Sequence, residues 1–228
     1  MTLSDLEQRI GILFNDKTLL AQAFVHRSHL NESKDRKQSN ERLEFLGDAV
    51  LSFITSRYLY ETYPDYPEGT LTNIRSTLVK TKSLGTVATE LGLGNLLLLS
   101  KGEESSGGRT NESLLADSFE ALLGAIFLDQ GIGKATEFLT AFLLTKTEDI
   151  VRTKSYVDFK SLLQEIVQEK TKLSPLYRVV KSEGPDHNKT FWVEVLTGET
   201  VMGQGHGKSK QEAEQKAAQA ALEKSGAI

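Results

Sequence analysis

The chain has 228 residues, of which 39% are hydrophobic and 25% are charged, a composition typical of a folded globular protein. It contains no cysteine, which excludes disulfides and thiolate metal sites, and its net charge of −4 is unfavourable for general nucleic-acid binding. This length suits one large domain or two small ones.

Apolar residues at helical spacing dominate the first two thirds of the chain and predict an all-α domain. The predicted helices cover residues 3–13, 17–28, 40–62, 69–80, 82–92, 111–129 and 133–149. The Gly/Ser-rich stretch 101–112 predicts a loop. The N-terminus has no basic segment followed by an apolar run, and the longest purely apolar run is 96–99. We therefore expect neither a secretory signal nor a membrane span.

The predicted helix 40–62 begins with NERLEFLGDAVL and places three carboxylates among apolar side chains. Glu41, Glu44 and Asp48 line one stripe of this helix, because residues three and four apart are neighbours on a helix. Like charges at that spacing repel one another, and partial burial further disfavours their ionised form. A bound cation would relieve both effects.

A second acidic helix follows Asn111, whose short side chain is a suitable N-cap, and carries Asp117 and Glu120 at i and i+3. If the two acidic stripes face each other, these residues meet Glu44 and Asp48 in a site of hard oxygen ligands. Such a site suits Mg²⁺ or Mn²⁺ and can activate water for phosphodiester hydrolysis. Acidic residues on helices are usually solvated, however, and spacing alone does not establish that the helices meet.

The hydrophobic period changes after a polar linker at 150–155. A helix is predicted over 158–170, strands over 176–184, 191–197 and 199–207, and a final Ala-rich helix over 208–225. This order is α-β-β-β-α. Net charge also differs along the chain, at −6 for residues 1–151 and +2 for residues 152–228, which places the excess of base in the second part.

These segments resemble those of a known family. NERLEFLGDAVL resembles the signature of the ribonuclease III family of double-stranded-RNA endonucleases, and LLADSFEALLGAIFLDQG, PEGTLTNIRSTLVK and AFVHRSHLNE resemble its other segments. The α-β-β-β-α order with GPDHNKTF and GHGKSKQEAEQKAAQAAL resembles a double-stranded RNA-binding domain. The resemblance covers essentially the whole chain. It implies an all-α endonuclease domain over 1–149, a linker over 150–155 and an α+β RNA-binding domain over 156–226.

The resemblance also implies a set of residues that bind divalent metal and carry catalysis. These are Glu44, Asp48, Asp117 and Glu120. Of the four, Asp48 and Glu120 would be the most critical for rate, while Glu41 and Glu68 match acids near the RNA path. Ser39 stands where many relatives have His, a departure that removes no ligand.

RNA contacts in the second domain are implied in three places: the first helix, the loop between the first two strands, and the start of the last helix. The matching residues are Ser161, Gln164, His187, Lys208, Ser209 and Lys210. Lysines at the start of a helix add charge to an N-terminus that already favours phosphate. Gln211 and Glu214 stand where lysines are common, so we expect weaker binding and a smaller salt dependence than in a fully lysine-clad domain.

The function implied by the resemblance is a Mg²⁺-dependent endoribonuclease, with Mn²⁺ able to substitute, that leaves 5′-phosphate and 3′-hydroxyl ends. The implied substrates are ribosomal RNA precursors and structured messenger and transfer RNAs. The implied setting is a cytoplasmic homodimer without membrane or organic cofactor. We read His26, His29 and His206 as structural or solvated, and Arg27 as buried beside the site.

Two other functions are alternatives to this one. An inactive nuclease domain would leave a protein that only binds duplex RNA, but all four ligand positions are acidic here. A di-iron bundle would use Glu-x-x-His pairs, and no histidine in this sequence lies three residues after a glutamate.

Overall fold

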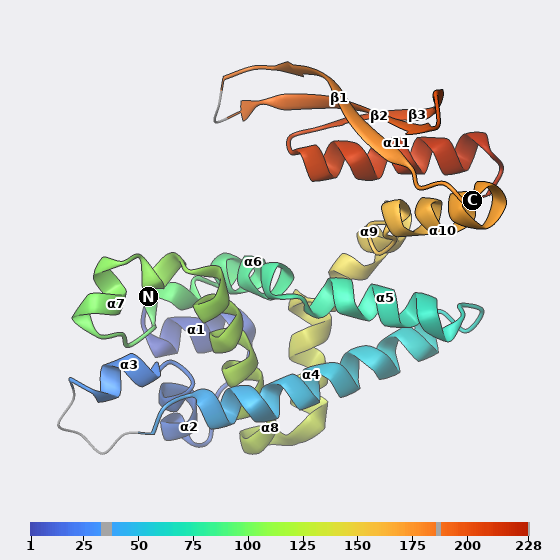
Figure 1. The fold of residues 1–228 in the computed structure, drawn as a ribbon. Helices are drawn as coiled ribbons and strands as arrows, with labels where there is room; N and C mark the ends of the chain where they lie inside the picture. The colour runs from blue at the N-terminus through green and yellow to red at the C-terminus, as the bar shows by residue number, and fades with distance from the viewer. Residues whose placement is uncertain (33–37, 186–187, 228) are drawn as a thin grey trace. The chain divides into compact units, whose positions relative to one another are not determined.

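Helices build the N-terminal part of the chain, as predicted (Figure 1). The computed structural model describes residues 1–32, 38–185 and 188–227, and it divides into two units, Met1–Tyr156 and Val157–Ile228. The helices of the first unit are α1 (Leu3–Ile10), α2 (Lys17–Gln22), α3 (Arg27–Leu30), α4 (Glu41–Thr62), α5 (Glu68–Val79), α6 (Thr81–Leu91), α7 (Lys101–Ser105), α8 (Glu112–Phe142) and α9 (Thr147–Arg152). No helix within the described ranges is long and apolar enough to cross a membrane.

The core of the first unit is centred on α8, whose middle turns are fully buried. Phe119 and Ile126 of α8 pack in the same core as Leu51 and Ile54 of α4. Each such side chain contributes roughly 1.5–3 kcal/mol when it is removed from water. Burial of apolar side chains along both helices therefore holds α4 against α8.

Several predicted boundaries differ from the structure. The predicted helix 17–28 is divided into α2 and α3. The break predicted between helices 111–129 and 133–149 is present within α8, where Gly131, at φ 78°, interrupts the helical path, but the second of these helices ends at Phe142 instead of residue 149. The predicted loop 101–112 contains the short helix α7 and a 3₁₀ turn at Gly108–Thr110. Ser100 caps α7 by accepting from the backbone N–H of Glu103.

The second unit has the predicted α-β-β-β-α order, with α10 (Phe159–Thr171), β1 (Leu176–Glu183), β2 (Thr190–Thr197), β3 (Thr200–Gly207) and α11 (Lys210–Lys224). The strands form an antiparallel sheet in the order β1-β2-β3. Helix α11 packs on β2 and β3 through a face of small side chains, including Ala213 and Ala217. At Gly205 of β3, a Cβ atom would lie 2.3 Å from the backbone nitrogen of Ala217, so the alanine-rich helix needs glycine opposite it.

Candidate functional site

Two glycines allow α4 and α8 to cross at very short range. A Cβ atom on Gly47 would lie 1.9 Å from the carbonyl oxygen of Glu120, and one on Gly124 would lie 2.2 Å from the carbonyl oxygen of Leu43. Real Cβ atoms do not approach other atoms this closely. The backbones of α4 and α8 are therefore in direct contact at this point.

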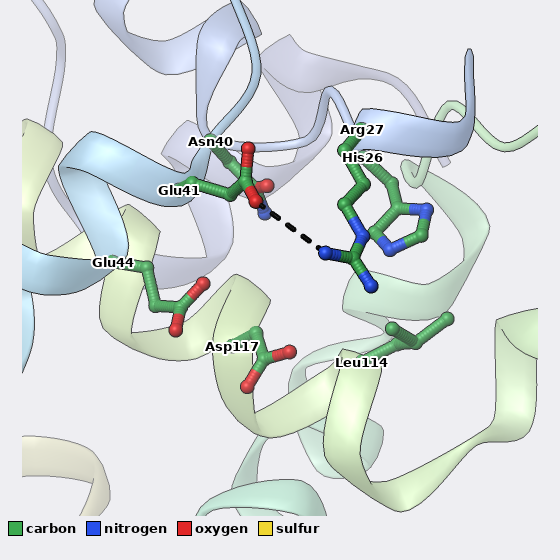
Figure 2. Close-up of a pocket in the computed structure, with 7 residues that line it drawn as sticks. All are labelled: His26, Arg27, Asn40, Glu41, Glu44, Leu114 and Asp117. Carbon is green, nitrogen blue, oxygen red and sulfur yellow. Dashed lines mark ion pairs between the residues drawn. The ribbon is translucent and has the colours of Figure 1, made fainter. Parts of the chain in front are cut away.

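The crossing brings the predicted ligands of the two helices together. Glu44 and Asp48 lie on either side of Gly47 in α4, and Asp117 and Glu120 lie on α8. Together these four residues form what we call the carboxylate cluster. Two of its members, Glu44 and Asp117, line a cavity of about 340 Å³. Its other lining residues are His26, Arg27, Asn40, Glu41 and Leu114, all drawn in Figure 2.

Burial raises the pKa values of three of these acids, and repulsion from neighbouring carboxylates raises two of them further. Desolvation, followed by the charges of Asp48, Glu44 and Asp117, raises the pKa of Glu120 to about 8. Desolvation and then Asp117 raise the pKa of Glu44. Burial also raises the pKa of Asp117, against the opposing positive charges of His26 and Arg27. The acids therefore lie close enough to disfavour one another's ionised form.

The chemistry of these side chains fits a hard divalent cation, because carboxylate oxygens are the ligands that Mg²⁺ and Mn²⁺ prefer. Within the described ranges, however, no three His, Asp or Glu side chains are arranged as a group that could hold a metal ion. The charges of the four acids therefore act on one another, but the side chains are not arranged as a group that surrounds a metal ion.

Arg27 was predicted to be buried, and this prediction is wrong: its side chain is 73% exposed. The Nη1 atom lies 3.8 Å from Oε1 of Glu41, an ion pair that Figure 2 marks with a dashed line. The charge of Arg27 also partly offsets the upward pKa shifts of Asp117 and Glu44. The sequence shows the positive charge of Arg27 but not its position, because α3 and α4 are brought together only by the fold.

Two further polar residues of the cavity, His26 and Asn40, were not predicted as site residues. The His26 ring caps α3 by accepting from the backbone N–H of Ser28, which agrees with a structural role, but the residue also lines the cavity. Asn40 is buried, and its Nδ2 donates to the carbonyl oxygen of Ala23. Its backbone N–H donates to the carbonyl oxygen of Val25, so Asn40 fixes the start of α4 beside the acids.

The two acids expected near the RNA path lie in different places. Glu41 lines the cavity and accepts a hydrogen bond from Oγ of Ser39. Glu68 lies at the start of α5, where its Oε1 accepts from Oγ1 of Thr72, and it is not among the residues that line the cavity. The structure of this unit therefore does not bring Glu68 to the carboxylate cluster.

In the second unit, the predicted contacts on α10 lie on a polar surface. Asp158 caps α10, and its Oδ2 accepts from the hydroxyl of Ser161. Ser161 and Gln164 line a cavity of about 240 Å³ with Gln211 and Gln215 of α11. This cavity, which we call the α10–α11 pocket, lies between two of the predicted RNA-contact regions.

The start of α11 presents the predicted phosphate contacts in exposed positions. Ser209 caps the helix by accepting from the backbone N–H of Glu212. The Nζ atom of Lys208 donates to Oδ1 of Asn188 and to Oγ1 of Thr190, which ties the lysine to the end of the loop before β2. Lys210 is exposed in the first turn of α11, whereas His187 lies outside the described residues.

Family comparisons assign both parts of the chain. Residues 16–147 match a family described as Ribonuclease-III-like, and residues 159–225 match the double-stranded RNA binding motif. The matched ranges fall within the first and second structural units, respectively.

Similar proteins extend over nearly the whole chain. Ribonuclease 3 from Enterococcus faecalis is 49% identical over 220 residues, which cover 96% of this chain and 95% of that protein. Ribonuclease 3 from Caldanaerobacter subterraneus is 45% identical over 99% of both chains. Among solved structures, the nuclease domain of ribonuclease III from Campylobacter jejuni, described with a flexible region involved in dimer formation, matches with a TM-score of 0.59 and 38% identity. That match covers 63% of this chain and 97% of the solved one.

Proposed function

The chain belongs to the ribonuclease III family of double-stranded-RNA endoribonucleases, and we propose that it hydrolyses duplex RNA at the carboxylate cluster with the help of divalent metal ions. The observation that carries this proposal is the close crossing at Gly47 and Gly124 of α4 and α8, the two helices that carry the four acids. Burial, followed by the charges of the other three acids, raises the pKa of Glu120 to about 8. A cation is the simplest means of keeping such acids ionised at neutral pH.

Glu44, Asp48, Asp117 and Glu120 would hold the metal, which we propose is Mg²⁺, with Mn²⁺ able to substitute. When bound, the metal would lower the pKa of an attacking water and stabilise the charge on the leaving 3′-oxygen. Such hydrolysis leaves 5′-phosphate and 3′-hydroxyl ends. Asp48 and Glu120 are the two that we propose as most important for rate.

Residues around the carboxylate cluster would hold the acids and the RNA in position for the reaction. The contact between Gly47 and Gly124 fixes the spacing of the two acidic helices, and Asn40 fixes the first turn of α4. Arg27, at the rim of the cavity, offers the phosphate backbone a positive charge opposite the acids. Glu41 and Glu68 are proposed to lie near the RNA path.

Substrate binding is proposed to involve the second unit. Ser161 and Gln164 on α10, with Lys208, Ser209 and Lys210 at the start of α11, would contact the minor grooves and the phosphates between them. Exposed lysines at a helix N-terminus favour phosphate through both charge and the helix dipole. Domains of this kind cover about 16 bp and read duplex shape and 2′-hydroxyls more than sequence. His187 is included in this proposal on the resemblance alone.

We also propose that the active form is a homodimer. An exposed apolar stripe along α4 supports this proposal: Phe45 is 81% exposed and Phe53 is 56% exposed, and Ala49 lies between them on the same face. Large apolar side chains that gather on one face are typical of a protein interface. A twofold interface would give two equivalent sites, one for each RNA strand.

Cleavage of a long duplex RNA tests the proposed reaction. The wild-type chain should cut it in Mg²⁺ or Mn²⁺, and Glu120→Gln, which has nearly the same shape, should bind the duplex without cutting it. Full activity in Glu120→Gln would refute the assignment of the site. Duplex binding by the wild-type chain without cleavage in either metal would instead favour a binding role.

We propose ribosomal RNA precursors and structured messenger and transfer RNAs as the natural substrates, and the cytoplasm as the setting.

A further inference from the structure

Lys160, in the first turn of α10, is held by three contacts. Its Nζ lies 2.5 Å from Oε2 of Glu214 on α11, and the same atom lies 4.8 Å from the centre of the Tyr177 ring. Its backbone N–H donates to Oε1 of Gln215 at 3.3 Å. The side chains of Lys160 and Glu214 are only 34% and 24% exposed, so this ion pair is better shielded from water than an ordinary surface pair.

The ion pair lies between the proposed RNA contacts. Lys160 immediately precedes Ser161, and Glu214 lies one helical turn after Lys210. Lys160 and Ser161 both line the α10–α11 pocket, together with Gln211 of α11. A duplex that contacts both helices would therefore pass over this pair.

Tyr177 also lines the pocket. The hydroxyl of Tyr177 is buried and has no hydrogen-bond partner among the described residues, while the ring of the same residue lies beneath the Lys160 ammonium. A buried hydroxyl without a partner is costly. The Tyr177 ring and the Glu214 carboxylate therefore both hold the Lys160 ammonium in place.

The two charges of the ion pair have opposite effects on RNA binding. The ammonium of Lys160 attracts a phosphate, whereas the carboxylate of Glu214 repels it, and together the two present no net charge. Phosphate and carboxylate are competing partners for the same ammonium, because both accept charge-assisted hydrogen bonds.

We propose that Lys160 is a phosphate-binding residue that Glu214 restrains, so that the ion pair limits the affinity of the second unit for duplex RNA. This inference rests on the proposed duplex-RNA binding and adds to it a residue and a restraint. Removal of the Glu214 charge releases Lys160 for one further phosphate contact. In the wild-type chain, Lys160 therefore contributes to RNA binding only when its ion pair with Glu214 is broken.

A double-mutant cycle on the full chain tests this inference. Duplex RNA longer than about 16 bp is titrated with wild-type, Glu214→Gln, Lys160→Met and the double variant, in EDTA to prevent cleavage and at several salt concentrations. Methionine keeps the apolar stem over Tyr177. Glu214→Gln should bind about 3- to 10-fold more tightly, and its log K against log salt slope should steepen by about 0.9, the value for one added contact on duplex DNA. The double variant should show neither the tighter binding nor the steeper salt slope.

Glu223→Gln is the matched control, because it removes the same charge from the exposed far end of α11 and should change affinity less than 2-fold. Thermal unfolding of each variant verifies that it is folded. An equal gain from Glu214→Gln with and without Lys160 would show only long-range repulsion and would overturn the inference. Absence of duplex binding by the wild-type chain would refute the proposed function and this inference with it. If the wild-type chain binds the duplex but the effects of Glu214→Gln and Lys160→Met on affinity simply add in the double variant, this inference alone would be overturned.

Discussion

Gly47 of α4 and Gly124 of α8 face each other across the helix crossing, where a Cβ atom on Gly47 would lie 3.1 Å from the backbone nitrogen of Gly124. The same Cβ atom would lie 1.9 Å from the carbonyl oxygen of Glu120. A backbone carbonyl within a buried helix cannot move aside as a flexible side chain can. The distance between the two halves of the carboxylate cluster is therefore set by the absence of side chains at these two positions.

Gly47→Ala is expected to destabilise the protein because the added methyl must push α4 away from α8. Overpacking of this kind costs about 1–3 kcal/mol, which exceeds the gain of roughly 1 kcal/mol that alanine brings to a helix interior. Chemical unfolding measures the difference. Gly69→Ala on α5 is the matched control, since a Cβ atom there meets nothing within 4 Å, and it should be neutral or slightly stabilising. Equal stability of the two variants would contradict the tight crossing.

The raised pKa of Glu120 predicts that metal-free protein loses stability as the pH rises. A carboxyl with a higher pKa in the folded state than in the unfolded chain binds more protons when folded. Its stabilising contribution is therefore present below the unfolded value of about 4.5 and is lost as the pH rises through the folded value of about 8. Urea unfolding in EDTA between pH 5 and pH 9, chosen to span about this range, should show the decline.

Glu120→Gln should flatten this pH dependence because glutamine does not titrate. The comparison is made in the same buffers and urea series, with Glu61→Gln as the control. Glu61 is an exposed residue in the last turn of α4, far along the helix from the cluster. A decline that is the same in Glu120→Gln as in the wild-type chain would show that Glu120 is not its source.

Long, strongly periodic segments could be predicted from the sequence. The spacing of apolar residues in α4 and α8 and the N-cap at Asn111 were sufficient to predict both acidic helices, and the structure confirms that cap. Helix α7 was not predicted because it has only five residues in a Gly/Ser-rich segment. Arg109 stabilises this region by donating to the carbonyl oxygens of Gly94 and Leu97, contacts that no local pattern reveals.

The candidate site was predictable as a set of residues but not as an arrangement. Spacing placed Glu44 and Asp48 on one face of a helix, yet their approach to Asp117 depends on a crossing some 70 residues apart in sequence. Arg27 is exposed, as its charge alone favours, because arginine is almost never fully buried unless it is paired. The arrangement of the site residues therefore depends on long-range packing, which the sequence pattern does not reveal.

Metal binding is expected to stabilise the wild-type chain. A ligand that binds only the folded state at ten times its Kd adds about 1.4 kcal/mol to the free energy of unfolding. Titration of Mg²⁺ into EDTA-treated protein at neutral pH should raise Tm, and the rise should be largely lost in Glu120→Gln. Glu61→Gln should respond as the wild-type chain does. A Tm that Mg²⁺ leaves unchanged in the wild-type chain would argue against a metal site at the carboxylate cluster.

Lys210→Gln is expected to weaken duplex-RNA binding and reduce its salt dependence. Loss of one phosphate contact should lower the slope of log K against log salt by about 0.9, on the scale known for duplex DNA. Fluorescence anisotropy in EDTA measures both quantities. Lys224→Gln, at the exposed far end of the same helix, changes the net charge equally and should leave the slope nearly unchanged. The same loss in both variants would indicate a general charge effect rather than a contact.

Phe53→Glu is expected to disrupt the proposed homodimer. Phe53 lies on the exposed apolar stripe of α4, eight residues after Phe45, and a charge there would have to be buried in a twofold interface. Sedimentation velocity should show a monomer for this variant and a dimer for the wild-type chain. Leu173→Glu is the control, because Leu173 is exposed to a similar degree, 51% against 56%, but lies in the second unit. Circular dichroism verifies the fold of each variant. A monomeric wild-type chain, or a dimer that survives Phe53→Glu unchanged, would contradict an interface on this face of α4.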